Sequence, residues 1–403
     1  MNLLNEGIKH GVVQPTVMTT KLTIDGITDV YPIYKIKLDQ LYYNDRNDRI
    51  ATWISKYKID NEVDELDREN KQVYNDIIHG FIVNSNPDKL KATETNIGLL
   101  GQQKYGIVLN DGRIIDGNRR YTCLRNLSKN DPKFNYFEAV ILDRNIEDNA
   151  KQIKMLELQI QIGEEARVDY DPIDRLVGIY NDIIENKLLT VHEYAMSTNQ
   201  TDNSVENTIE LATLLIEFLE AINAPKQFYL ARELDLDGPL HELQGILNKI
   251  KDEDQREAMK YAVFTNFLLR PEKDMTRFVR QIKAVAKSKY LDEFLEKESE
   301  IVENVLDDLP KSGEVTEQVI SEMRENDDAN EHLRETMEIV SNKVKISDTK
   351  EKPNQILNKI ISSLNEVDQR IFIKLSEAQV EDIEEQLDLI EEKIDEIRGN
   401  LDV

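Results

Sequence analysis

The stretch IVLNDGRIIDGNRRYTCLR, residues 107 to 125, decides the fold of the N-terminal part of this 403-residue chain. Asn110-Asp111-Gly112 has the residue chemistry of a tight hairpin turn, because Asn, Asp and Gly tolerate positive φ with little strain. Apolar runs flank this turn on both sides. We therefore predict two short strands over residues 106–109 and 113–115.

A helix start that bears two arginines follows the second strand. Gly117 lets the backbone turn sharply, and apolar residues at helical spacing predict a helix over residues 119–127. Free backbone N–H groups and the helix dipole favour negative charge at such an N-terminus. The guanidinium groups of Arg119 and Arg120 suit phosphate. The segment indicates an anion site, and the alternative is a structural turn with solvated arginines.

The segments that follow come in a recognisable order. A strand-like run spans residues 137–143, and an acidic helical run spans residues 147–162. Glu164-Glu165-Ala166-Arg167 comes next, and Pro172-Ile173-Asp174 follows after a short spacer.

This order resembles the N-terminal domain of the ParB partition-protein family, which has the ParB/sulfiredoxin-like fold. Gly117-Asn118-Arg119-Arg120 is similar to the second sequence box of the family, Gly-Glu-Arg-Arg, with Asn118 in place of Glu. Arg167 and residues 172–174 are similar to the third box. A strand over residues 34–38 and the Asp- and Asn-rich turn over residues 44–49 resemble the first box. The resemblance covers roughly residues 30 to 175.

The resemblance implies a nucleotide pocket that holds CTP or ATP with Mg²⁺. Carried over to this sequence, Gly117, Asn118, Arg119 and Arg120 would contact the phosphates, and Arg167 would close the pocket. Glu164 or Glu165 would supply the carboxylate on the metal side. The family has Glu-Asn there, whereas this chain has Gly163-Glu164 or Glu164-Glu165, so the metal ligand and the base preference stay open.

Asp116 lies directly before the glycine of the second box. As a carboxylate beside two arginines, it could hold Mg²⁺ or act as a base. The alternative is a carboxylate that only caps the helix and pairs with Arg120.

Composition sets the outer bounds. A single cysteine, Cys123, excludes an intramolecular disulfide framework and fits a reducing compartment. Its position within the arginine helix predicts a core residue. No run of eighteen apolar residues occurs, and residues 1–22 lack the apolar core of a signal peptide. We therefore expect a cytoplasmic protein that neither spans a membrane nor is secreted.

The net charge of −27 bears on the usual partner of the family, which is DNA. Phosphate neutralisation supplies most non-specific DNA affinity, so an acidic protein needs a segregated basic face. Residues 173–215 resemble the helix-turn-helix region of the family, and Thr190 with Glu193 forms a capping box pattern there. This region holds seven acidic residues against Arg175 and Lys187, and the expected recognition helix over 205–211 has no Lys or Arg. DNA binding stays possible but is disfavoured.

The C-terminal part is expected to be helical. We predict domains over residues 1–170, 171–309 and 317–403, a linker over 310–316 and a second break over 347–353. Apolar residues recur at gaps of three and four from Val380 to Leu401, which is the seam of a coiled coil. Such a seam favours a homodimer, and an intramolecular hairpin is the alternative. The expected fold class is α+β, with an N-terminal mixed domain followed by a mostly helical middle and C-terminus.

Three functions fit these patterns. The first is a nucleotide-binding switch with slow hydrolysis as an option; the distribution of such domains places it in a mobile-element, phage or host-defence setting. The second is a Mg²⁺-dependent nuclease or phosphotransferase that uses Asp116 with Glu164 or Glu165. The third is an interaction scaffold with a vestigial pocket.

Overall fold

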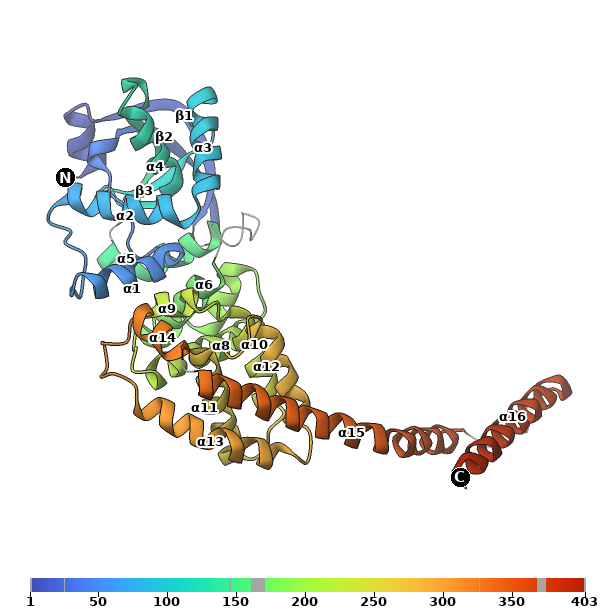
Figure 1. The fold of residues 1–403 in the computed structure, drawn as a ribbon. Helices are drawn as coiled ribbons and strands as arrows, with labels where there is room; N and C mark the ends of the chain where they lie inside the picture. The colour runs from blue at the N-terminus through green and yellow to red at the C-terminus, as the bar shows by residue number, and fades with distance from the viewer. Residues whose placement is uncertain are drawn as a thin grey trace. The chain divides into compact units, whose positions relative to one another are not determined.

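The structure is a computed structural model that describes residues 2–24, 26–144, 146–160, 171–325, 327–367 and 375–401. It has an N-terminal five-stranded mixed sheet followed by a long run of helices (Figure 1). The predicted α+β fold class is therefore confirmed. Residue contacts divide the chain into two compact units, Met1–Ser341 and Asn342–Val403. The domain boundaries that we expect at 170 and 317 stay predictions.

The sheet has the strand order β1-β2-β5-β3-β4. Its strands are β1 (Val13–Ile24), β2 (Ile27–Lys37), β3 (Gly106–Leu109), β4 (Ile114–Asp116) and β5 (Tyr136–Leu142). β3 runs parallel to β5, and the other neighbouring strands are antiparallel. A parallel bridge between Tyr42 and Arg113 adds the segment before the 44–49 turn to the free edge of β4. This bridge places the start of the 44–49 turn near the beginning of β4.

Helices cover both faces of the sheet. One face packs against α1 (Ala51–Asp60), α2 (Lys71–Ser85), α3 (Pro87–Leu100) and α4 (Asn118–Ser128). The other face packs against α5 (Ile146–Leu158), which contributes the buried side chains of Ile153 and Leu156. The sheet is therefore the central layer, and α4 and α5 lie on opposite sides of it.

The predicted hairpin turn is confirmed with a shift of one residue. Gly112 has a φ of +97°, and its N–H donates to the carbonyl of Leu109 at 3.0 Å. The second strand spans Ile114–Asp116 rather than 113–115. Arg113 instead pairs with Tyr42 at the parallel bridge, which takes it out of the regular ladder with β3.

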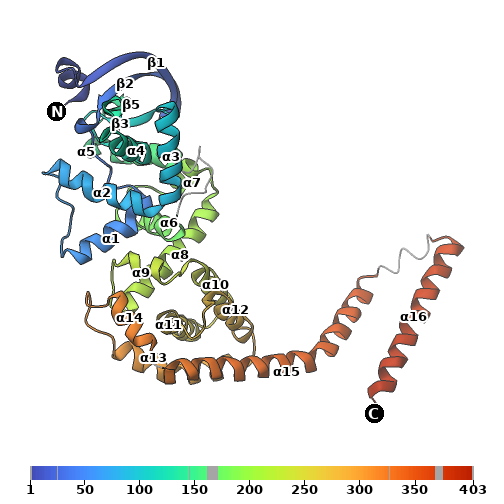
Figure 2. The ribbon, with the colours of Figure 1, turned by 45° about the horizontal axis from the view of Figure 1, so that its top comes forward.

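Helices fill the rest of the first unit. Those before the linker are α6 (Pro172–Ile179), the π-helix η6 (Tyr180–Glu185), α7 (Val191–Thr198), α8 (Asp202–Ala221), α9 (Phe228–Glu233), α10 (Asp237–Leu247), α11 (Glu253–Leu269), α12 (Met275–Val285) and α13 (Leu291–Asp307). Figure 2 looks nearly along α11, which contacts α8, α10, α13 and α14 (Glu317–Arg324). The cluster of Phe218, Phe264 and Phe267 packs edge to face in this bundle, as expected for core residues.

The predicted linker over 310–316 lies between α13 and α14 and packs against the bundle. The Gly313 N–H donates to the carbonyl of Asn223 at 3.0 Å, and Val315 is fully buried. Residues 317–341 belong to the first compact unit, because Ile320 and Leu333 are buried there.

Two predictions about helix ends were wrong. The expected break over 347–353 does not occur, because α15 runs without interruption over Asp327–Asn365 with Pro353 inside it. Pro353 removes one helical hydrogen bond, but it is exposed, so water can satisfy the freed carbonyl. The helix expected from Ser204 begins earlier, because the Thr201 side chain caps it and accepts from the Ser204 N–H.

The second unit consists of the distal part of α15 and of α16 (Glu377–Leu401). No described residue of α16 is buried. Among the helices of the described residues, none combines the length and the apolar character that crossing a membrane requires.

Candidate functional site

The second sequence box and the preceding Asp116 form a compact turn between β4 and α4. We call this turn, residues 116–120, the clasp. Gly117 is the N-cap of α4 and has a φ of +104°. The Arg120 guanidinium group donates to the Asp116 carboxylate at 2.6 Å and to the carbonyls of Lys104 and Tyr105 at 2.8 Å each. Arg120 therefore ties the start of α4 to the end of β4 and to the residues before β3. Of the two readings of Asp116, the structure shows the pairing with Arg120.

Gly117 has no room for a side chain. A Cβ atom at this position would lie 2.7 Å from the Phe137 ring and 3.3 Å from the Arg120 guanidinium group. Its left-handed backbone is also a conformation that side chains disfavour. The turn therefore depends on glycine for both space and backbone angle.

The remaining predicted site residues fall into two groups. Asn118 is buried, and its side-chain oxygen has no hydrogen-bond partner among the described residues. Arg119 is half-buried on α4. Glu164, Glu165 and Arg167 lie outside the described residues, so the structure brings together only Asp116 and residues 117–120. Within the described part of the chain, no group of three His, Cys, Asp or Glu side chains could hold a metal ion.

Cys123 is a core residue, as expected. Its side chain is fully buried, and its thiol lies 3.6 Å from the carbonyl of Leu90. Burial raises the pKa of the thiol to about 12. A thiol with so high a pKa is a poor nucleophile at neutral pH.

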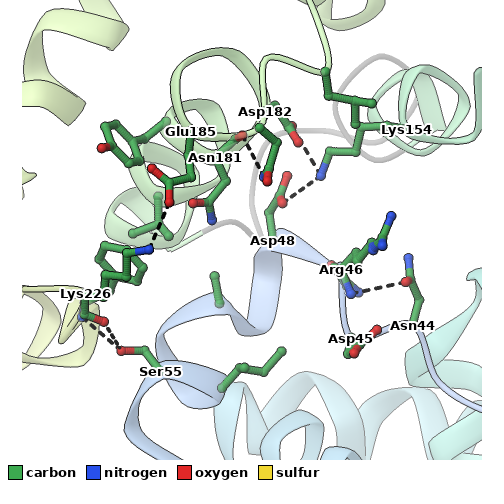
Figure 3. Close-up of a pocket in the computed structure, with 18 of the residues that line it drawn as sticks. Asn44, Asp45, Arg46, Asp48, Ser55, Lys154, Asn181, Asp182, Glu185 and Lys226 are labelled. Atoms are coloured by element: carbon green, nitrogen blue, oxygen red, sulfur yellow. Dashed lines mark hydrogen bonds and ion pairs between the residues drawn. The ribbon is translucent and has the colours of Figure 1, made fainter. Parts of the chain in front are cut away.

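A cavity of about 740 Å³ lies at the junction of the sheet domain and the first helices after it. Its walls are the turn of the first sequence box, α1, α5, η6 and the loop before α9 (Figure 3). The polar lining residues include Asn44, Arg46, Asp48, Lys58, Lys154, Asp182, Glu185 and Lys226. Among the described residues that line it, none comes from 116–120.

A buried ion-pair network forms one wall of the cavity. Lys154 of α5 donates to Asp48 at 2.7 Å and lies 3.3 Å from Asp182 of η6, and Figure 3 shows both carboxylates pointing to its ammonium group. Glu157, one turn further along α5, accepts a hydrogen bond from the Asn44 side chain at 3.4 Å. Three segments distant in sequence therefore meet at Lys154.

The protonation of this network follows from burial and charge. Burial alone would lower the pKa of Lys154, but Asp48, Glu157 and Asp182 raise it well above 10.5. Burial and the neighbouring Asp48 raise the pKa of Asp182 to about 7, against the opposing effect of Lys154. Lys154 is therefore a permanent cation that neutralises the carboxylates around it.

Two other cations face the cavity without a partner in the described part of the chain. The Arg46 side chain is exposed, and only its backbone N–H is bonded, to the Asn44 side chain at 3.1 Å. Lys58 of α1 is half-buried, and its side chain likewise has no described hydrogen bond or ion pair. By contrast, Lys226 pairs with Glu185 at 2.9 Å. Arg46 and Lys58 are therefore the lining cations that are open to an added anion.

The cavity walls are held together by polar contacts between the turn and the helices. The Thr52 N–H at the start of α1 donates to the buried Asp174 carboxyl of α6 at 2.9 Å. Arg232 of α9 donates to the Thr52 hydroxyl at 2.6 Å and lies over the Trp53 ring. Gly178 of α6 packs so closely on Asp48 that a Cβ atom would lie 2.6 Å from its carboxyl carbon. Any ligand in the cavity would touch both the sheet domain and the helices.

Sequence reasoning found part of this cavity. The likeness to the first box predicts the 44–49 turn, and Asn44, Arg46 and Asp48 of this turn line the cavity, whereas residues 172–174 of the third box do not line it. Lys154 and Asp182 were missed, because a lysine and an aspartate on separate helices give no local pattern. The one available signal was the apolar neighbourhood of Lys154, which lies between Ile153 and Leu156 in sequence.

The helix-turn-helix region has the expected capping box but no basic face. The Thr190 hydroxyl accepts from the Glu193 N–H, and the Glu193 carboxylate accepts from the Thr190 N–H. α7 and α8 are joined by a tight turn at Asn199, whose φ is +53°. α8 contains no Lys or Arg over its whole length. This helix therefore lacks the cations that phosphate contacts require.

Comparisons with known proteins give limited support. No family model matches the chain, and no curated protein matches it. A solved Pnob8-like ParB-N domain is similar over 70% of this chain and 99% of its own, at 12% identity and a TM-score of 0.34. At that TM-score the likeness does not establish a common fold.

Proposed function

We propose that the protein is a ParB-like nucleotide-binding switch that takes CTP or ATP, with Mg²⁺, in the cavity beside the 44–49 turn. The observation that carries the proposal is the cavity itself, which is lined by the turn of the first sequence box and presents Arg46 and Lys58, whose side chains have no partner among the described residues. Its volume of about 740 Å³ is within the usual range of small-molecule sites.

The phosphates are proposed to lie against Arg46 and Lys58, with Arg167 closing the site as the family resemblance implies. Arg120 is proposed to act as a positioning residue, because it lies outside the cavity lining and donates to Asp116 and to two carbonyls.

Mg²⁺ needs no preformed cage in this proposal. It is commonly held by one or two carboxylates together with substrate phosphates. Asp48 and Asp182 lie on the cavity wall, and the resemblance adds Glu164 or Glu165. Bound ligand would bridge the sheet domain and the helices, which is how binding would change the conformation of a dimer.

The test is calorimetric titration of CTP, ATP, GTP and ADP with Mg²⁺ into the wild type and an Arg46→Ala/Lys58→Ala variant. A Lys9→Ala/Lys21→Ala variant is the matched control, because both lysines are exposed and outside the cavity. We expect one nucleotide to bind, with at least a ten-fold loss in the cavity variant and none in the control. Absence of binding to all four nucleotides would reject the proposal.

A further inference from the structure

The C-terminal helix α16 presents an apolar seam that its own unit leaves uncovered. The exposed fractions of Val380, Leu387, Ile394, Ile397 and Leu401 run from 38% to 77%. At about 100° per residue, the seam residues fall within an arc of about 100°. A stripe of this width fits one partner helix along its length.

The distal part of α15 presents a second apolar face, which is wider. Ile356, Ile360, Ile361 and Leu364 are all more than 40% exposed, and Leu357 lies between them. At about 100° per residue, these residues span an arc of about 140°. This apolar face is wider than the strip that one neighbouring helix covers, so two helices are needed to cover it.

α16 and the distal part of α15 have opposite net charges. α16 carries ten acidic and two basic residues, a net charge of −8. Residues 342–367 carry five lysines and three acidic residues, a net charge of +2. Pairing of α16 with distal α15 therefore joins unlike charges, whereas pairing of two α16 helices brings together two strongly acidic ones.

The residues beside the α16 seam also disfavour a parallel pair of α16 helices. In such a pair, the positions that flank the seam would place Gln379 against Glu384, Gln386 against Glu391, and Lys393 against Arg398. None of these is a pair of opposite charges, and the last is a repulsive pair.

We propose that two copies of this chain associate through a four-helix bundle in which each acidic α16 lies between the basic distal segments of two α15 helices. This arrangement covers the wide α15 face with two helices and keeps the two α16 helices diagonal and apart. The partner is a second copy, because one chain supplies only one α16 for each α15 face. The inference does not depend on nucleotide binding.

Sedimentation of the full-length protein without nucleotide tests the association. We expect a dimer that weakens at least ten-fold in Lys350→Glu/Lys352→Glu/Lys359→Glu and recovers when Glu384→Lys/Glu391→Lys is added. Lys9→Glu/Lys21→Glu/Lys249→Glu is the control, because it changes the net charge equally at exposed sites in the first unit. A monomer at all concentrations, or equal weakening in the control, would overturn the proposal.

Disulfide cross-linking tests the pairing, since the single native cysteine is fully buried. We expect a covalent dimer when Ile360→Cys chains are mixed with Ile383→Cys chains, and none from either alone. Self-linking of Ile383→Cys would show that α16 pairs with itself, and it would contradict the bundle.

Discussion

The sheet domain has two arginine-bearing turns that differ in what their guanidinium groups contact. At the end of β4, Arg120 donates to Asp116 and to two carbonyls, so three of its five N–H groups are used inside the fold. In the 44–49 turn, the Arg46 side chain is exposed at a cavity and has no described partner. The turn with the stronger sequence likeness to a phosphate-binding box is thus the one whose arginine is used inside the fold. Motif likeness identifies a position, but the contacts decide its role.

The largest effect is expected on the cavity side of this comparison, at Lys154. Lys154→Met removes the cation between Asp48 and Asp182 and leaves buried carboxylates without compensation. We expect the free energy of unfolding to fall by about 3–5 kcal/mol. Urea denaturation measures it.

Lys151→Met is the control on the same helix, because the Lys151–Glu193 pair is partly exposed and should contribute less than about 1 kcal/mol. Equal losses in the two variants would show that the Lys154 network is not a special feature of the cavity wall.

The free energy of unfolding is expected to be sensitive to a substitution of Gly117 in the clasp. Gly117→Ala places a Cβ atom 2.7 Å from the Phe137 ring on a left-handed backbone, and we expect a loss of about 2–4 kcal/mol. Gly98→Ala, in the last turn of α3, meets only an ordinary contact at 3.8 Å and should gain about 0.5–1 kcal/mol. Thermal unfolding of both variants compares them directly. A neutral Gly117→Ala would mean that the clasp can relax.

The buried carboxyl group of Asp174 should make the stability of the protein depend on pH. Burial raises the pKa of Asp174 from 3.8 to about 7. The folded protein therefore holds a proton that the unfolded chain releases, so the free energy of unfolding should fall as pH rises from about 4 to about 7 and then level off.

Asp174→Asn keeps the acceptor for the Thr52 N–H and should remove the part of this fall that Asp174 causes, about 3 kcal/mol between pH 4.5 and 8. The raised pKa of Asp182 should leave a remaining fall in the variant. Urea denaturation at pH 4.5, 6 and 8 measures the slope. A wild-type slope that persists unchanged in Asp174→Asn would assign it to other groups.

The smallest effect on stability is expected at Arg120. Arg120→Ala removes three hydrogen bonds from a partly exposed clasp and should cost about 1–2 kcal/mol. Arg398→Ala in α16 is the control, because its pair with Asp395 is exposed. No loss at Arg120 would mean that its contacts are replaced by water.

How much the sequence could predict depended on how local the determinants were. The Asn110-Asp111-Gly112 turn, the helix after Gly117 and the capping box at Thr190 follow from residues within a few positions of each other, and the structure confirms them. The Lys154 network and the cavity join α5, η6 and the 44–49 turn, which lie far apart in sequence. Nothing in the local pattern of Lys154 names Asp48 or Asp182 as its partners.

Local sequence signals gave a wrong prediction where the surrounding helix continued in spite of them. Pro353 and its polar neighbours favour a break, but the exposed helix α15 continues through them. The sequence left two roles open for Asp116; the structure shows its 2.6 Å contact with Arg120, and a metal or base role stays a prediction.

The most direct test of the account compares the two turns in one measurement. CTP and ATP with Mg²⁺ are titrated by calorimetry into Arg46→Ala/Lys58→Ala and into Arg120→Ala, at a temperature where both variants are folded. The account predicts that the first variant loses at least ten-fold in affinity, while the second retains the affinity of the wild type. Loss of binding in Arg120→Ala with retention in Arg46→Ala/Lys58→Ala would contradict it and place the phosphates at the clasp.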